Sequence, residues 1–245
     1  MSTEKNSDWP AHLVLGAMIM ATALVVTGWL VSNGLKDLRT GDRTVMVRGL
    51  AEQDAKANLA IWPIRFVATG NNLAETQGKI ESDLEKVRQF LSAAGFPEEN
   101  LSLQRLEVTD RLAQGYGQNN IRERYMIAQT VNVRTDNVDQ VQAQSRRLGE
   151  LVKQGVVLQD WRGPVYLFTQ LNDIKPDMIA KATANAREAA EQFAQDSGAT
   201  LGGIKQASQG YFSIQPRDNT GGTDEKSEIH KRVRVVTSVT YALDD

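Results

Sequence analysis

The 245-residue chain contains no cysteine and only two histidines, His12 and His230. A chain without cysteine forms no disulfide, carries no thiolate nucleophile and builds no cysteine-based metal site. One histidine lies at the border of a long apolar run and the other at the start of the last predicted strand. With no cysteine beside them, they do not assemble a His-rich metal site or a catalytic triad. We therefore predict no catalytic residue, no metal ligand and no cofactor, and we expect a protein that is not an enzyme.

Excess charge of either sign is also missing, since the formal net charge is −2. This balance gives no bulk electrostatic reason to expect a nucleic-acid partner. The one basic run, residues 230–234, reads as part of a strand, with Lys231 on one face and Arg232 and Arg234 on the other. Aromatic residues, which single-strand binding would require, are not interleaved with it. We interpret the run as a solvated or subunit-facing sheet surface, with contact to anionic lipid or nucleic acid as the lesser alternative.

A long stretch without charge is present near the N-terminus, at residues 13–31 (LVLGAMIMATALVVTGWLV). As a helix it would reach about 28 Å, close to the ~30 Å hydrocarbon core of a bilayer. Trp9 and Trp29 stand near its two ends, where indole rings favour the membrane interface. The sequence therefore predicts a tail at 1–12, a transmembrane anchor at 13–31, a charged linker at 32–43 and a water-soluble body at 44–245.

Two other interpretations of the apolar run are open. A cleaved signal peptide has an apolar region of about 7–15 residues followed by a small-residue cleavage site. Here the run is longer, and its A-x-A sequence (21–23) lies in the middle. A buried core helix is disfavoured because the run is apolar all round and N-terminal.

The greater number of lysines and arginines after the run than before it favours a cytoplasmic body.

The body alternates predicted strands and helices. Strands are predicted at 44–49, 57–69, 101–109, 124–134, 164–171, 201–214 and 231–243, and helices at 73–94, 137–154 and 175–196. Pro63 indicates an edge position or a bulge in the second strand, because proline donates no hydrogen bond to a ladder. The order indicates two β-α-β-β-like halves, in an α+β fold with helices packed on largely antiparallel sheets.

Helix ends and inner faces follow from local signals. We predict Asp136 as the N-cap of the second helix and glycine stops at 95, 155 and 198. The inward residues of the second helix are predicted to be Val138, Val141, Leu148, Leu151 and Val152. Those of the third helix are Ile179, Ala182, Ala186, Ala189 and Phe193. Small residues on this face would let the third helix lie close to a sheet.

Three further patterns are weighed as sites and set aside. Gly115-Tyr116-Gly117 precedes no helix, so it indicates a hairpin loop rather than a phosphate-binding turn. Residues 218–224 hold oxygen ligands near glycine but lack the glutamate of an EF-hand, which favours a solvated loop over a calcium site. Arg146-Arg147 and the Glu188/Glu191 pair read as solvated helix faces.

Three stretches resemble the SIMPL domain family, bacterial envelope proteins long catalogued as a domain of unknown function. They are TVMVRG at 44–49, FLSAAGFPEENL at 90–101 and the Ala-rich AKATANAREAAEQFAQDSG at 180–198 with the strand after it. The likeness covers about 44–243 and departs from the family at Trp62-Pro63 and in having an anchor in place of a cleaved signal peptide. It implies a secreted or membrane-anchored envelope protein without known catalytic residues, linked to stress tolerance and sometimes assembled into ring-like oligomers.

Our first hypothesis is a non-enzymatic, single-pass inner-membrane protein whose periplasmic SIMPL-like domain forms a homo-oligomer, as an envelope scaffold or stress-tolerance factor. We place the body in the periplasm, against the lysine and arginine count, because a short N-terminal tail usually stays inside. The candidate contact surfaces are the strand at Pro63, the Ala-rich helix and the hairpin loops. The alternative is a binding module for a small ligand or an envelope protein partner, acting through loops 112–122 and 215–228. A hydrolase built on Asp and Glu is the third hypothesis, but the sequence identifies no such pair.

Overall fold

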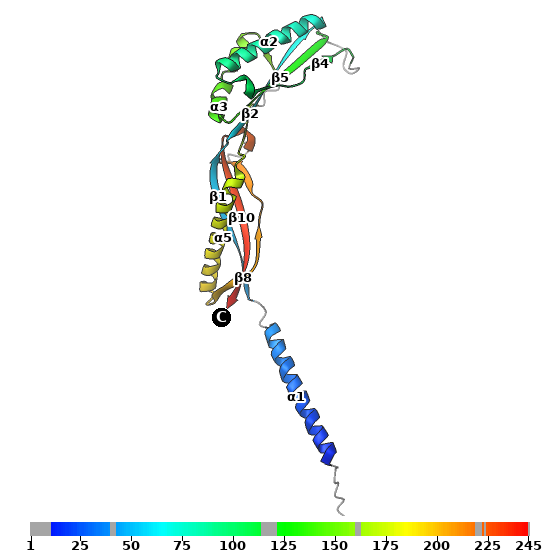
Figure 1. The fold of residues 1–245 in the computed structure, drawn as a ribbon, viewed down its shortest axis with the longest axis vertical. Helices are drawn as coiled ribbons and strands as arrows, with labels where there is room; N and C mark the ends of the chain where they lie inside the picture. The colour runs from blue at the N-terminus through cyan, green and yellow to red at the C-terminus, as the bar shows by residue number, and fades with distance from the viewer. Residues whose placement is uncertain are drawn as a thin grey trace, which may run out of the picture. The chain divides into compact units, whose positions relative to one another are not determined.

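The computed structural model describes residues 11–39, 43–113, 122–159, 163–218, 222 and 224–244 (Figure 1). Its strands are β1 (Thr44–Lys56), β2 (Leu59–Gly70), β3 (Leu101–Leu103), β4 (Glu107–Asp110), β5 (Tyr125–Thr135), β6 (Val157–Leu158), β7 (Val165–Leu167), β8 (Thr200–Gln209), β9 (Ser213–Pro216) and β10 (His230–Asp244). Its α-helices are α1 (Ala11–Arg39), α2 (Leu73–Ala93), α3 (Val138–Ser145), α4 (Gly149–Lys153) and α5 (Leu171–Asp196), with short 3₁₀ turns η1 (Glu98–Asn100) and η3 (Glu225–Ser227). Helices and antiparallel sheets together confirm the predicted α+β class.

Helix α1 covers the apolar run at 13–31. Its described apolar side chains are highly exposed, as Leu24 (70%), Val25 (71%) and Trp29 (63%) illustrate. Within the described part of the chain, no helix combines the length and the apolar character needed to cross a membrane.

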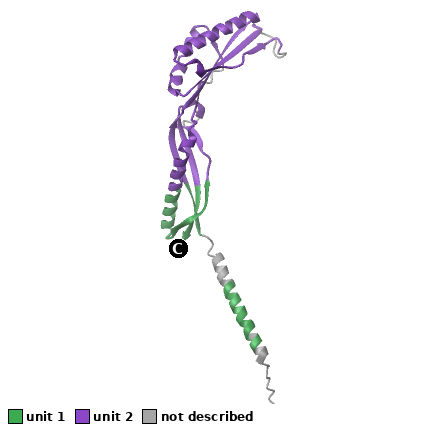
Figure 2. Cartoon of the chain, in the orientation of Figure 1, with its two compact units in different colours: residues 1–48, 186–208, 238–245 green, residues 49–185, 209–237 purple. Residues whose placement is uncertain are grey.

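The chain divides into two compact units (Figure 2). Unit 1 is Met1–Arg48, Ala186–Ser208 and Ser238–Asp245, and unit 2 is Gly49–Asn185 and Gln209–Thr237. Each unit therefore contains part of β1, α5 and β10.

The larger sheet, in unit 2, has the strand order β3-β5-β2-β6, with β4 also paired to β5 and β7 also paired to β2. The β2–β5 ladder is the longest, running antiparallel from Ala60↔Thr135 to Gly70↔Tyr125. Alternate side chains of β2, from Ala60 through Trp62 to Ala68, enter one buried core with the inner face of α2. The Trp62 ring meets Phe96 edge to face, with the centroids 6.1 Å apart. This core forms because every second side chain of β2 lies on one apolar face, and the apolar residues of α2 recur every three or four positions and form a face that packs against it.

Pro63 predicted an edge position or a bulge. The edge position is wrong for β2 as a whole, because β2 lies inside the sheet. On one side Pro63 faces Asn132 of β5. On the other side β7 pairs with residues 59–61 and β6 with residues 66–67, so the neighbouring strand is interrupted at Pro63. Proline has no backbone N–H, and it is tolerated there because no neighbouring strand would accept a hydrogen bond at the interruption.

Helix α2 matches its prediction closely. The Asn72 side chain accepts hydrogen bonds from the backbone N–H groups of Ala74 and Glu75. At the other end Gly95 has φ +85°, and the N–H of Phe96 bonds the carbonyl of Leu91. This closing pattern needs a left-handed residue, which explains the glycine stop.

The single helix predicted at 137–154 is wrong. The structure has α3 and α4, separated by a turn at 146–148 whose bonds join residues three apart, such as Arg147 N–H to the Gln144 carbonyl. The N-cap is Asn137 rather than Asp136. The break changes the inward face, so Leu148 and Leu151 are buried as predicted while Val152 is 55% exposed.

Several predicted strands also differ. The strand predicted at 101–109 is split into β3 and β4, and the strand predicted at 201–214 is split into β8 and β9. The strand predicted at 164–171 is reduced to β7, and β6 was not predicted. At the second split, Gly210 donates its N–H to the Val236 carbonyl, and a Cβ at this position would lie 2.8 Å from that oxygen. Close backbone approach therefore requires glycine there and ends the regular strand.

The smaller sheet has the order β1-β10-β8, with β9 also paired to β10. Helix α5 begins at Leu171, four residues before the prediction, and contains Pro176. Its buried residues recur every four positions, at Met178, Ala182, Ala186, Ala190 and Ala194. In unit 1 they pack with Val47, Val239 and Tyr241, and in unit 2 with Ala51, Val233 and Val235. The predicted burial of Phe193 is wrong, since it is 59% exposed.

Candidate interaction surface

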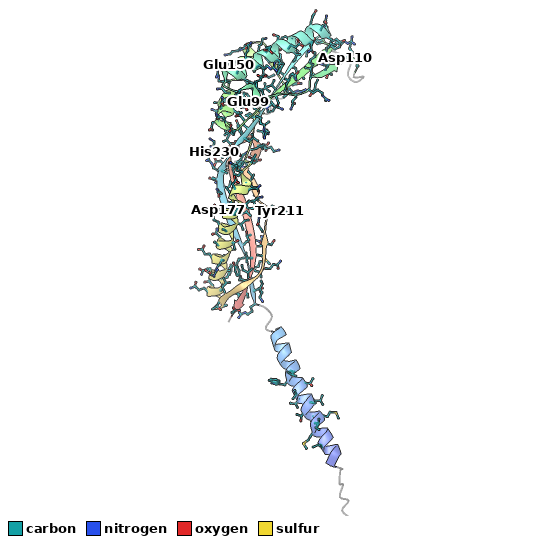
Figure 3. The ribbon with its side chains drawn as sticks, in the orientation of Figure 1. Glu99, Asp110, Glu150, Asp177, Tyr211 and His230 are labelled. Atoms are coloured by element: carbon teal, nitrogen blue, oxygen red, sulfur yellow. The ribbon has the colours of Figure 1, made fainter. Side chains whose placement is uncertain are left out.

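The basic run at 230–234 alternates in β10 as predicted, but its interpretation as a solvated or subunit-facing surface is wrong for Lys231. Lys231, Val233 and Val235 are buried, whereas Arg232 and Arg234 occupy the opposite face. His230, at the start of β10, is exposed (Figure 3).

Both arginines of this run meet carboxylates of β1. Arg232 Nε lies 3.0 Å from Asp54 Oδ1, and Arg234 Nη1 lies 3.6 Å from Glu52 Oε1. The hydrogen bond to Asp54 raises the pKa of Arg232. Because β1 supplies opposite charges to these arginines, the run offers a polyanion little unbalanced positive charge.

Lys231 is completely buried and reaches the turn before β10. Its Nζ lies 2.8 Å from Glu225 Oε1 and also donates a hydrogen bond to the Glu225 carbonyl. The short helix η3, part of the predicted loop 215–228, is thereby fastened to the sheet. A buried charge with a partner is stable only while both groups stay together.

Acidic side chains of the loop at 215–228 form hydrogen bonds within the loop itself. Arg217 Nη2 lies 2.8 Å from Asp218 Oδ2, and this hydrogen-bonded pair lowers the pKa of Asp218. Asp224 accepts the backbone N–H of Lys226 as the cap of η3. Residues 219–221 and 223 of the candidate calcium segment lie outside the described residues. Across the described ranges, no group of three or more histidines and carboxylates is arranged to hold a metal ion.

The other candidate loop, 112–122, joins β4 to β5, and these strands form the predicted hairpin. Residues 114–121, including the Gly115-Tyr116-Gly117 pattern, lie outside the described residues. At the base of the hairpin, Arg124 Nη2 lies 2.8 Å from Asp110 Oδ2 and lowers the pKa of Asp110. The Arg124 guanidinium also lies 4.8 Å from the centroid of the Tyr125 ring.

The described ends of the two loops do not come together. The β4–β5 hairpin closes beside Gly70, at one end of β2, because Gly70 pairs with Tyr125. Helix η3 contacts β7, which pairs with Leu59 at the other end. A strand of twelve residues spans about 36–40 Å. Asp110 and His230, which flank the two loops, accordingly lie well apart (Figure 3).

An exposed strand edge belongs to β8. Every residue of β8 is exposed except Leu201 and Gly202, which are partly buried. Among the described strands, β8 pairs with β10 alone, so it forms one edge of its sheet. Gly210, the residue after β8, donates its N–H toward β10. Because the N–H groups of a strand alternate in direction, we expect those of Ala207 and Gln209 to point away from β10. Unpaired edge groups are a template for another strand.

The sequence interpretation missed a buried ionic cluster on α2. Asp83 is fully buried and pairs with Lys79 and Lys86 on the same helix. The two lysines also donate to the carbonyls of Gly155 and Gln154 after α4. The spacings of three and four residues on a predicted helix were a signal for the pairs, but not for their burial.

The remaining candidates are solvated, as predicted, but only Glu188 and Glu191 lie on a helix, because Arg146 and Arg147 stand in the turn between α3 and α4. Arg146, Arg147, Glu188 and Glu191 are exposed or partly paired on the surface, with Arg147 bonded to Glu150 and Glu191 bonded to Arg187. The side chain of His12 lies outside the described residues.

Comparison with known proteins places most of the chain in one family. Residues 45–241 match the model of the SIMPL family, described as a protein of unknown function (DUF541). No curated protein sequence matches the chain. The matched span runs from β1 to β10 and includes both sheets. The chain therefore belongs to the SIMPL family.

Proposed function

We propose that this protein is a non-enzymatic envelope scaffold that is attached to a membrane by residues 13–31 and self-associates through the edge of β8. The proposal rests on one observation: β8 is exposed and is paired with another described strand on one side only. A periplasmic location of the body and a part in stress tolerance belong to the same proposal, and family resemblance supports them.

Strand addition suits this edge for a physical reason. A second β8 placed antiparallel beside the first would satisfy outward N–H and C=O groups on both copies. The edge carries only two bulky apolar side chains, Leu201 and Ile204, and Ile204 is 56% exposed. Backbone hydrogen bonds would therefore provide most of the attraction.

The test removes one outward donor from the edge. Ala207→Pro deletes the N–H that points away from β10, whereas Ala207→Ser keeps it as the matched control. We expect full-length chain in detergent to form a discrete oligomer by light scattering, and the proline variant to shift toward the monomer. A monomeric parent chain, or an oligomer unaffected by the proline, would contradict association through β8.

Membrane attachment rests on different residues and is tested separately. Residues 13–31 hold no charge, and the described apolar side chains of α1 are exposed. We expect the full-length chain to stay in the membrane pellet after an alkaline carbonate wash. The double variant Val25→Asp/Val26→Asp should release it, because each carboxylate at mid-membrane costs about 2.5–3.5 kcal/mol. The control Thr27→Ser should remain in the pellet, and a parent chain that washes free would refute attachment.

Recruitment of a protein partner is the second candidate function. The separation of loops 112–122 and 215–228 along β2 favours a large partner over a small ligand held by both loops. Deleting either loop alone should then weaken capture of that partner, and unchanged capture after both deletions would count against it.

A further inference from the structure

A cavity of about 250 Å³ lies in unit 2 between the C-terminal half of α2 and α4. Its lining residues are Lys86, Gln89, Phe90, Ala93, Ala94, Arg147, Glu150 and Gln154. The space exists because α2 ends in two alanines where longer side chains would reach α4. A space of this size accommodates several waters or one small organic molecule.

The wall of this cavity is rich in hydrogen-bond donors. Lys86 donates to Asp83 and to the Gln154 carbonyl, which leaves one of its three N–H groups. Arg147 donates three N–H groups, two to Glu150 and one to Gln144, and keeps two of its five.

Two side-chain amides add to this supply. Among the described residues, no hydrogen-bond partner faces the side-chain amide of Gln89 or that of Gln154. Each amide contributes two N–H donors and one carbonyl oxygen with two acceptor lone pairs. The donors available to an occupant therefore outnumber the acceptors.

The net charge of the cavity wall also favours an anionic occupant. The ionisable lining groups are Lys86, Arg147 and Glu150. Lys86 shares the buried carboxylate of Asp83 with Lys79, so these three cations and two carboxylates leave one net positive charge. The hydrogen bond from Arg147 lowers the pKa of Glu150, so this carboxylate is ionised at neutral pH and is already engaged. Phe90, at 8% exposure, provides an apolar surface beside the charges.

From this combination we infer that the α2–α4 cavity binds a small organic carboxylate. The carboxylate accepts from Lys86, Arg147 and the glutamine amides, and the apolar part of the ligand lies against Phe90. Charge-assisted hydrogen bonds of this kind are about twice as strong as neutral ones. Binding at this site is independent of association through β8, because none of the lining residues belongs to that strand.

Benzoate is a suitable probe, because it combines a carboxylate with a ring that can contact Phe90. The experiment titrates the full-length chain with sodium benzoate by calorimetry, and with benzamide as the uncharged analogue of the same shape. For so small a molecule we expect a Kd of about 1 mM. Benzamide should bind at least about tenfold more weakly, since it lacks the charge.

Two matched pairs of variants locate the binding. Arg147→Gln removes a lining cation, and Arg146→Gln removes the same charge from its exposed neighbour outside the cavity. Ala93→Phe fills the cavity, and Ser92→Phe places the same ring one residue away. We expect Arg147→Gln to weaken benzoate at least about tenfold and Ala93→Phe to abolish its binding. The two control variants should stay within about twofold of the parent.

Three outcomes would overturn the inference. They are no benzoate binding at about ten times the expected Kd, equal binding of benzamide, and unchanged binding in Ala93→Phe. Circular dichroism of each variant separates loss of the site from loss of the fold.

Discussion

The Lys231 ammonium is completely buried and has Glu225 as its partner, through both the carboxylate and the backbone carbonyl of that residue. The two residues of the pair differ in how much solvent their side chains contact. Glu225 retains 28% side-chain exposure and can be hydrated, whereas Lys231 has no contact with solvent.

Stability should therefore respond unequally to removal of either partner. Glu225→Gln leaves a buried ammonium without its counter-charge, which typically costs about 3–5 kcal/mol. Lys231→Met replaces the charge with an apolar chain of similar length and should cost less, about 1 kcal/mol. Urea unfolding monitored by circular dichroism measures both. Equal losses, or a larger loss for Lys231→Met, would contradict this account of the pair.

Asp83 provides a second test of buried charge. Asp83→Asn weakens the pairs with Lys79 and Lys86, and these lysines also bond the carbonyls after α4. We expect a loss of about 2–4 kcal/mol in unfolding free energy. The control Glu85→Gln breaks an exposed pair with Arg88 on the same helix and should cost less than about 0.5 kcal/mol.

Two glycines with the same backbone geometry should differ in their tolerance of alanine. Gly95 and Gly155 have φ of +85° and +84°, so the backbone conformation would be unfavourable for alanine by about 1–2 kcal/mol at either position. A Cβ at Gly95 would also lie 3.0 Å from Gln140 Nε2, whereas the space at Gly155 is open. Thermal unfolding should show a larger loss for Gly95→Ala than for Gly155→Ala. The reverse order would exclude the Gln140 contact as a factor.

The base of the β4–β5 hairpin should show a defined pH dependence. Arg124 holds the pKa of Asp110 below its usual 3.8. The ion pair therefore stabilises the fold above that usual value, and this contribution is lost as pH falls through the lower pKa of the folded state. Melting temperatures measured from pH 6 down to about pH 2 should fall more for the parent chain than for Asp110→Asn. Parallel curves would show that the pair contributes nothing to stability.

Local sequence signals determined a large part of this protein. The helix predicted at 73–94, with its glycine stop at 95, matches α2, because capping and side-chain periodicity act within a few residues. Alternation along β2 and β10 predicted which side chains share a face, and it placed Lys231 with Val233 and Val235, although the burial of Lys231 was not predicted. Composition alone excluded any chemistry that depends on cysteine.

Tertiary structure decided what depends on distant parts of the chain. Only the fold pairs β1 with β10 from opposite ends of the sequence, interrupts the neighbours of β2 at Pro63 and leaves Phe193 exposed. The burial of Asp83, the separation of the two loops and the α2–α4 cavity have the same origin. Periodicity reports which face of an element is apolar, but the element packed against that face is selected by the free energy of the whole core.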